Sequence, residues 1–459
     1  MLTFLQRNTY FRQEKGFYRK VLYIAIPIVL QNMISIGLNI IDTLMVGRVG
    51  VLELAAVGAG NQIYFIFTTI CYGIFSGAAV YTAQYWGIKD IKNIRKVLGI
   101  DYVVAIFMAL VVSFCVWIFA PDILWLFARN TSVIELGSKY LRVACFSYLF
   151  TAVSFAINYN CRSIQQLKVP TIINATALLI NTILNYGLIY GNLGLPEMGV
   201  RGAAIATVIA RILETIVLLT YIYHHPEHPL AGQMSELFSF SRTMFKKVMK
   251  TAVPVVLSES GWSIATAITF IAYGILGASA LAVVQVASVV NEFFQSLFFG
   301  IGNAAAVMLG EKLGRGETEK AESYSQTFLR VLFVMSVVIT AFLILIRGGI
   351  ADLYQFDAMT EELLMNTLFV WSLFLGPKMI VYILVCGILR SGGDTQFTMV
   401  FDLAGNWLLG IPLAFLGVLV FHLSLPLAVG LSSMSEIVKA IIFWRRYKSK
   451  KWIRILIES

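Results

Sequence analysis

The sequence predicts an all-α integral membrane protein with about twelve transmembrane helices, arranged as two six-helix parallel repeats around a central cleft. Of its 459 residues, 58% are hydrophobic and only 13% are charged, whereas soluble domains carry about 25% charged residues. The apolar residues form runs of about 20 or more, long enough to cross a hydrocarbon core of roughly 30 Å. Short charged loops separate these runs, and the second half of the chain repeats the plan of the first.

The apolar runs define the predicted membrane helices one after another along the chain. Each run ends at a loop that contains charged residues or Gly, Pro, Asn and Asp, which are typical of turns and helix ends. The predicted helices span residues 20–47, 53–86, 91–119, 134–160, 169–191, 200–223, 247–275, 279–312, 319–346, 361–389, 396–420 and 424–446.

Basic residues are concentrated in alternate loops, which predicts the orientation of the chain. Lysine and arginine accumulate in loops on the cytoplasmic side of membrane proteins. The pattern therefore predicts a multi-pass protein with both termini in the cytoplasm, and it explains the net charge of +10 without nucleic acid. The expected location is the inner membrane of a prokaryote. The residues assigned to the cytoplasmic side include Arg7, Arg12, Lys15, Arg19, Lys20, Arg162, Lys168, Arg390, Arg445 and Arg446.

The repeat is visible as matched glycine and proline residues. A shift of 227 residues places Pro27 on Pro254, Gly47 on Gly274 and Gly73 on Gly300 without a gap. Because each half has an even number of helices, both halves enter the membrane in the same direction, and such parallel repeats alternate access by rocking around a central site. Pro27 and Pro254 are predicted to bend their helices.

The repeat sets the predicted domain boundaries. They are an N-terminal lobe at 1–223, a cytoplasmic linker at 224–246 and a C-terminal lobe with a basic tail at 247–459. The linker histidines at 224, 225 and 228 are interpreted as part of a solvated loop rather than a metal site. No GxxxxGK[ST] motif for ATP occurs, so transport would draw its energy from an ion gradient or from the gradient of the substrate.

Polar and ionisable residues within the predicted spans are the candidate functional residues, because such groups are costly in a bilayer. In the N-terminal lobe, Asp42 is an ionisable residue deep in the first helix, and Asn181 and Asn185 lie one helical turn apart on the fifth. Thr207 on the sixth helix adds a hydroxyl oxygen. This set suits a proton or a hard cation, although Asp42 could also serve only as hydrogen-bonding glue between helices.

The C-terminal lobe has its own mid-span charges. Glu259, Glu292 and Lys378 would leave one net negative charge, which suits a second cation or proton site, or they could form a buried ion pair that serves packing. Two closely spaced pairs, Arg211 with Glu214 and Glu436 with Lys439, are interpreted as local structural ion pairs.

Several stretches resemble the multidrug and toxin extrusion (MATE) family over nearly the whole chain. They are Pro27 followed by Asp42 and the segment TLMVG at 43–47, AQYWG at 83–87, the Asn181 to Asn185 spacing, GVRGAAIAT at 199–207, GEKLG at 310–314 and GILRSGGD at 387–394. The resemblance implies twelve helices in two lobes and export of organic cations driven by Na+ or H+. It implies that Asp42 couples ions, with Asn181, Asn185 and Thr207 as partners.

The resemblance is closer to the branch that uses a first-helix aspartate than to the NorM-type branch with a C-lobe site. The NorM-type seventh-helix glutamate position is Trp262 here, with Glu259 one turn earlier, and the tenth-helix aspartate position is Met379, beside Lys378. In the archaeal-type pattern of the family, an aspartate stands at the position of Asn185. The site here therefore has one carboxylate fewer, which favours H+ over Na+ as the coupling ion.

The sequence thus predicts a secondary antiporter that exports amphipathic, mostly cationic compounds in exchange for H+ or Na+. It is expected to be a monomer in the lipid bilayer, without cofactors, and not an enzyme, because no hydrolytic cluster or nucleophile motif lies in the spans. The alternative is a flippase for lipid-linked oligosaccharides. Such proteins often carry basic residues in the central cavity, whereas Lys378 is the only strong mid-span base here.

Overall fold

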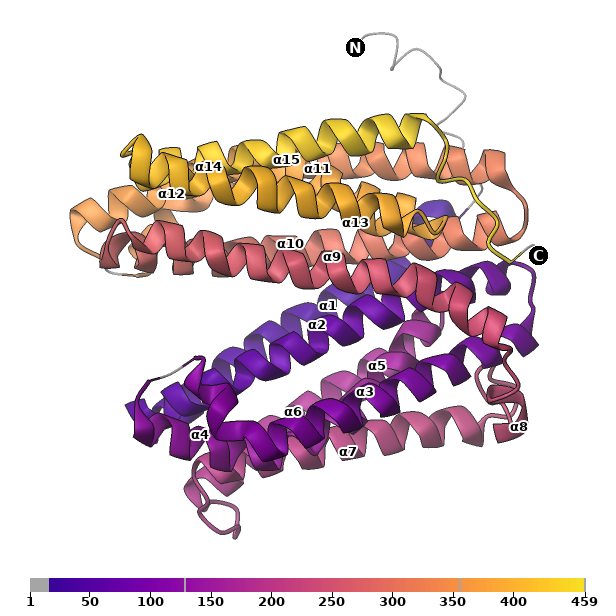
Figure 1. Cartoon of the computed structure of the whole chain (residues 1–459), viewed down its shortest axis with the longest axis horizontal. Coiled ribbons are helices and arrows are strands. Elements are labelled where there is room, and N and C mark those ends of the chain that lie inside the picture. The colour runs from indigo at the N-terminus through magenta and orange to yellow at the C-terminus, as the bar shows by residue number, and fades with distance from the viewer. Residues whose placement is uncertain (1–15, 128, 355, 458–459) are drawn as a thin grey trace. The chain divides into compact units, whose positions relative to one another are not determined.

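The computed structural model describes residues 16–127, 129–354 and 356–457, which form helices joined by short loops, without a strand in these ranges (Figure 1). Eleven helices are long and apolar enough to cross a membrane, and a bent helix pair raises the number of candidate spans to twelve. The predicted fold class is therefore confirmed. The N-terminal basic residues Arg7, Arg12 and Lys15 lie outside the described residues.

Within the described residues, the first half of the chain contains seven helices that provide six candidate spans. The fourth span is broken, because α4 and α5 meet at an angle of 51°. The sequence predicted one continuous helix there, at 134–160. The helices are α1 (Phe17–Gly47), α2 (Val51–Gly87), α3 (Ile91–Trp125), α4 (Thr131–Ala144), α5 (Ser147–Ser163), α6 (Lys168–Tyr190) and α7 (Val200–His224).

The second half repeats this order after a short connecting helix, α8 (Met234–Leu237). Two of its spans contain π-helical segments, which the sequence analysis did not anticipate. The elements are α9 (Arg242–Gly274), α10 (Ala278–Gly314), α11 (Thr318–Asp352), α12 (Ala358–Tyr382), η2 (Ile383–Leu389), α13 (Thr395–Ala404), η3 (Gly405–Gly410), α14 (Ile411–Phe415), η4 (Leu416–Val420) and α15 (Leu425–Lys448).

Helix lengths confirm the internal repeat. Helices α2 and α10 both have 37 residues, and α3 and α11 both have 35, each pair related by the shift of 227. The shift becomes 228 at Arg162 and Arg390, so the second half has gained one residue by that point. A π-helical turn accommodates one extra residue without breaking a helix, and η2 lies just before Arg390.

The chain folds into two compact units that exchange the first parts of two helices. The N-unit comprises Leu30–Val256, and the C-unit comprises Met1–Val29 with Leu257–Ser459. The division crosses α1 and α9 two residues after Pro27 and Pro254, and both helices run on through their prolines. The predicted lobes describe the repeat in the sequence, whereas the compact units place the start of each half in the opposite unit.

Two related glycines allow these exchanged segments to pack closely. A methyl group added at Gly73 of α2 would lie 2.6 Å from Cα of Val256, in the first half of α9. One added at Gly300 of α10 would lie 2.8 Å from the carbonyl oxygen of Ala25 in α1. Both contacts lie within one unit. Because any side chain would force the helices apart, the matched glycines predicted from the repeat each mark a close helix approach within one unit.

A strap follows the last helix of each half of the chain and folds back onto a helix bundle. The N-strap comprises residues 225–241, and the carbonyl oxygen of its buried Leu237 lies against Gly99 of α3. The C-strap comprises residues 449–457, and its fully buried Trp452 lies against Gly392. These contacts hold the strap backbones against the bundles.

An ion pair from the third span of each half holds each strap, with the charges reversed. Arg95 of α3 contacts Glu236 of the N-strap at 2.8 Å, and Glu322 of α11 contacts Lys450 of the C-strap at 2.6 Å. Arg95 and Glu322 are equivalent under the shift of 227. The straps therefore belong to the repeated plan, and each of these two ion pairs lies within one unit.

The N-strap contains a buried histidine, which corrects the prediction of a fully solvated linker. Only 5% of His228 is exposed, and the backbone N–H of Leu230 donates to its Nδ1 at 3.2 Å. The linker histidines 224 and 225 are solvent-exposed as predicted. Burial, with the nearby His225, lowers the pKa of His228 to about 4.

Acidification is expected to loosen the N-strap. The folded-state pKa of His228 lies below the unfolded value of 6.5, so its contribution to stability is complete above pH 6.5 and is lost as the pH falls toward about 4. We expect the melting temperature of the purified protein to fall by a few degrees over this window. In the variant His228→Asn, which keeps an acceptor for the backbone N–H of Leu230, the melting temperature should depend less on pH. An equally steep decline in this variant would show that other groups cause the acid sensitivity.

Candidate functional site

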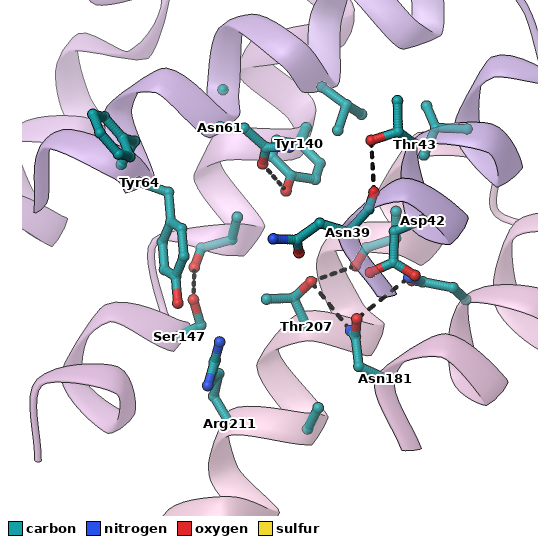
Figure 2. Close-up of a pocket in the computed structure, with 18 of the residues that line it drawn as sticks. Asn39, Asp42, Thr43, Asn61, Tyr64, Tyr140, Ser147, Asn181, Thr207 and Arg211 are labelled. Carbon is teal, nitrogen blue, oxygen red and sulfur yellow. Dashed lines mark hydrogen bonds between the residues drawn. The ribbon is translucent and has the colours of Figure 1, made fainter. Parts of the chain in front are cut away.

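The N-unit contains a cavity of about 510 Å³ formed by α1, α2, α4, α5, α6 and α7 (Figure 2). All four residues predicted for the N-lobe site line it, namely Asp42, Asn181, Asn185 and Thr207. The structure therefore brings together side chains from three helices that are far apart in sequence.

Asp42 lies five residues before the end of α1 and accepts hydrogen bonds on both carboxylate oxygens. The hydroxyl of Thr182 on α6 donates to Oδ1 at 3.3 Å. The Asn181 amide, oriented so that its nitrogen and oxygen both find partners, donates to Oδ2 at 3.0 Å and accepts from the backbone N–H of Thr207 at 3.2 Å. Asn185, one turn further along α6, is within 3.5 Å of Asn181. Thr182 is a partner of Asp42 that the sequence analysis did not select.

A second, charge-balanced group lies in the same cavity. Arg211 Nη1 contacts Glu214 Oε2 at 2.7 Å, and the Asn174 amide donates to Glu214 Oε1 at 2.9 Å. The predicted local pair of Arg211 and Glu214 is thus present, and both residues line the cavity. Because Glu214 is neutralised by Arg211, Asp42 is the acidic side chain of the described cavity lining that has no cationic partner.

Aromatic and amide side chains complete the N-unit cavity. Figure 2 shows Tyr64 and Tyr140 on the wall that faces Asp42 and Asn181. The hydroxyl of Tyr140 donates to Asn61 Oδ1 at 3.1 Å. A cavity with aromatic walls and one unpaired carboxylate combines the two groups that attract an amphipathic cation, an apolar π surface and a negative charge.

The C-unit contains a smaller cavity of about 230 Å³. Glu292 and Lys378 both line it, and neither forms an ion pair with a described residue. Glu436, Trp262 and Trp371 also line it. The predicted second site is therefore divided, because Glu259 does not line this cavity.

Glu259 instead pairs with a residue that the sequence analysis placed in a cytoplasmic loop. Arg390 Nη2 contacts Glu259 Oε1 at 2.9 Å, and only 6% of the Arg390 side chain is exposed. The loop assignment of Arg390 was therefore wrong. Its place beside a glycine-rich turn suggested a loop, whereas the π-helical segment η2 carries the span as far as this residue.

A buried network around Lys439 adjoins the C-unit cavity. The Lys439 ammonium contacts Glu436 at 2.8 Å, Asp402 at 3.3 Å and the Asn406 amide oxygen at 3.0 Å. The predicted pair of Glu436 and Lys439 is present. Asp402, which also accepts from the hydroxyl of Ser258 at 2.9 Å, was missed, although its position within an apolar run was a usable signal.

Comparison with known proteins gives consistent results over most of the chain. A family model described as MatE matches residues 27–187 and again 254–416. The chain is 24% identical to a probable multidrug resistance protein NorM of Mannheimia succiniciproducens, covering 97% of each chain. It is 23% identical to a probable multidrug resistance protein YoeA of Bacillus subtilis, covering 88% of each.

A solved structure has the same fold. A crystal structure of MATE in the bent conformation superimposes with a TM-score of 0.86 at 18% identity, covering 95% of this chain and 96% of that one. The two matches to the family model fall on the two repeats, because their starting residues, 27 and 254, are again separated by 227.

Proposed function

Because the chain belongs to the MatE family, whose members are membrane transporters and not enzymes, we propose that it is a multidrug efflux antiporter. It exports amphipathic, mostly cationic compounds in exchange for protons. The observation that carries this proposal is the unpaired carboxylate of Asp42 in an aromatic-walled cavity within the membrane. A proton and an organic cation can each neutralise this charge, and the two would therefore compete for it.

The hydrogen bonds of Asp42 favour H+ over Na+. A hard cation is held by several oxygen atoms that point at it. Here the amide nitrogen of Asn181 and the hydroxyl of Thr182 point their hydrogens toward the carboxylate. These donors stabilise the ionised carboxylate between proton-binding events. One carboxylate with donors around it therefore suits proton exchange better than sodium binding.

The C-unit cavity contrasts with this arrangement. The ammonium group of Lys378 lines the same cavity as Glu292 and Glu436, so that cavity already contains a covalently attached cation. A mobile cation would have to compete with it. We therefore assign ion coupling to the N-unit, and we assign to the C-unit a supporting part in substrate passage.

The transport cycle then follows from competition at Asp42. Protonation from the outside neutralises the carboxylate and releases the cationic substrate, and loss of the proton on the inside restores the charge that binds the next substrate. The two repeats alternate access between these states. With both termini in the cytoplasm, as the basic loops predict, the cycle exports substrate from a bacterial cell across its inner membrane. The transporter is proposed to act as a monomer.

Reconstitution tests this proposal. Proteoliposomes that contain the purified protein should transport ethidium when a proton gradient is imposed, and a Na+ gradient alone should have no effect. Collapse of the proton gradient with a protonophore should stop transport. Transport driven by Na+ alone would contradict proton coupling. Transfer of a lipid-linked oligosaccharide without ethidium transport would instead support the flippase alternative.

Asn185→Asp is expected to create a Na+ response that the wild type lacks. The change adds a second carboxylate one helical turn from Asn181, and hard cations prefer several anionic oxygens. In the same proteoliposomes, Na+ should now stimulate ethidium transport by the variant. Asn174→Asp is the matched control, because it adds the same charge on α6 beside Glu214 instead of Asp42. Equal Na+ responses in both variants would show that added charge alone is responsible.

A further inference from the structure

A second acidic residue is buried in the N-unit, away from the cavity. Asp101 on α3 is only 1% exposed. Its Oδ2 accepts from the Asn160 amide of α5 at 2.7 Å, whereas its Oδ1 has no hydrogen-bond partner among the described residues. An ionised carboxylate in such a place lacks a counter-charge, and a protonated one lacks an acceptor for its hydrogen. Neither protonation state is fully satisfied.

The surrounding hydrogen bonds fix the orientation of this carboxyl group. The Asn160 amide nitrogen also donates to the carbonyl oxygen of Ala156 at 2.9 Å, and its oxygen accepts from the Thr82 hydroxyl of α2 at 2.7 Å. Because every polar atom of the Asn160 side chain is engaged, the amide cannot turn to accept a proton from Asp101. The group Thr82, Asp101 and Asn160, called here the α3 triad, thus joins α2, α3 and α5.

The groups around the α3 triad carry no charge that could neutralise Asp101. The nearby titratable side chains ordinarily titrate well above neutral pH, and they come from α3, α5 and α7, namely Tyr102, Cys161 and Tyr223. The flanking charges are engaged elsewhere. Arg95 of α3 pairs with Glu236 of α8, and the Arg162 guanidinium of α5 stacks on Tyr159 at 4.7 Å.

The repeat provides an internal comparison that separates function from folding. The shift of 227 residues places Thr82 on Leu309 and Asp101 on Phe328, and the shift of 228 places Asn160 on Ile388. All three counterparts are fully buried apolar residues. The C-unit therefore builds the same helix contacts without a polar group, so the fold does not require the α3 triad. A buried carboxyl group that the fold does not require is a candidate functional group.

Buried polar side chains of α5 lie between the cavity and the α3 triad, with a gap of six residues between Ser154 and Asn160. Ser147 of α5 lines the cavity, as does Tyr64, whose hydroxyl is 3.4 Å from Thr151. Ser154 follows one turn later, 2.9 Å from Thr215. Asn160 then contacts Asp101. These groups lie along α5 from the cavity to the triad, and all the α5 members are buried.

Asp42 and Asp101 lie toward opposite ends of the N-unit. At about 1.5 Å per residue, Asp42 is roughly 8 Å from the end of α1, and Asp101 is roughly 15 Å from the start of α3. Helix α2 crosses the unit between those two ends. A proton that enters beside Asp42 therefore has a second carboxyl group on the far side of the cavity.

From these observations we propose that Asp101 is a second proton-binding residue of the N-unit, which receives a proton from the Asp42 side and releases it at the α2–α3 end. The inference rests on the proposed proton antiport. It adds a residue that exchanges protons during the cycle and that belongs to neither cavity.

Infrared difference spectroscopy tests the proposal on the full-length protein. Spectra with and without ethidium should show two bands from protonated carboxyl groups that change on binding and shift in D2O. Asp42→Asn should remove one band, and Asp101→Asn the other. If only the Asp42 band changes in the wild type, the Asp101 proposal is overturned while proton antiport stands. If neither band changes, proton antiport itself fails.

A second variant covers the case in which Asp101→Asn does not fold. Thr82→Val leaves the carboxyl group in place but removes the hydrogen bond that orients Asn160. It should shift the Asp101 band and slow proton-driven ethidium transport several-fold. Ser163→Ala, another buried hydroxyl between α5 and α2, should change neither. An unshifted band in Thr82→Val would contradict the proposal.

Discussion

Asp42→Asn is expected to abolish drug export and leave the fold intact. Asparagine has nearly the same size as aspartate, so the contacts with Thr182 and Asn181 can largely be kept. It cannot bind or release a proton, and it removes the negative charge that attracts a cationic substrate. Resistance of drug-hypersensitive cells should fall to that of cells without the transporter, with equal amounts of protein in the membrane.

Glu53→Gln is the matched control for this result. Glu53 is an acidic residue in the first turn of α2, close to the same end of the N-unit, and it does not line the cavity. Its neutralisation should leave resistance unchanged. If Asp42→Asn cells stay resistant, or if both variants lose resistance equally, Asp42 is not the coupling residue.

Lys439→Met is expected to destabilise the C-unit more than any other single change considered. The Lys439 side chain is 2% exposed and contacts two carboxylates, Glu436 and Asp402. Removing one partner of a buried ion pair costs about 3–5 kcal/mol, because the remaining charge is left uncompensated. Here two carboxylates would lose their counter-charge. We expect a large fall in the melting temperature of the purified protein and poor recovery from the membrane.

A triple variant distinguishes the loss of charge compensation from the loss of packing at Lys439. Neutralising both acids in the Lys439→Met background, by Asp402→Asn and Glu436→Gln, removes the unpaired charges and keeps side chains of similar volume. Because a buried charge network can be replaced by neutral groups at little cost, most of the lost melting temperature should return. If the triple variant is as unstable as Lys439→Met alone, the Lys439 side chain matters for its packing.

The helices and the repeat could be predicted because their signals are local and strong. Apolar runs define the spans, and a residue such as Gly73 or Gly300 is needed wherever two helices approach closely, so the requirement appears twice in the sequence. The broken fourth span was not predictable in this way. The bend between α4 and α5 interrupts an apolar run without a proline or glycine at the break.

The partners of individual charges were harder to predict. Asp42, Asn181, Asn185 and Thr207 were selected because each lies inside a span, and the cavity brings them together. Which charge neutralises which depends on helix rotation and packing, which composition does not reveal. Arg390 therefore looked like a loop residue, although it is buried beside Glu259.

Aspartates in long apolar runs were overlooked for a related reason. Asp101 follows a basic segment closely enough to resemble a residue at the membrane boundary, but α3 continues without interruption past it. Counting residues from the Asp90 cap would have placed it well inside the span. Asp402 was missed in the same way, because Gly392 and Gly393 nearby suggested a turn.

The two units share a backbone plan but differ in whether their buried acidic residues have cationic partners. In the C-unit, Lys439 and Arg390 neutralise Asp402 and Glu259, and Lys378 lines the cavity with Glu292. In the N-unit, Asp42 and Asp101 have no cationic partner among the described residues. The repeat supplies the scaffold, and in the proposed cycle the unpaired acids place the proton chemistry in one unit.

The most direct test of this account counts the protons released when a substrate binds. Calorimetric titration of ethidium into the purified transporter, repeated in buffers with different ionisation enthalpies, gives that number. The competition at Asp42 predicts that Asp42→Asn releases about one proton fewer per bound substrate than the wild type when Asp42 starts protonated. The same proton release in both proteins would contradict the assignment of Asp42 as the residue at which substrate and proton compete.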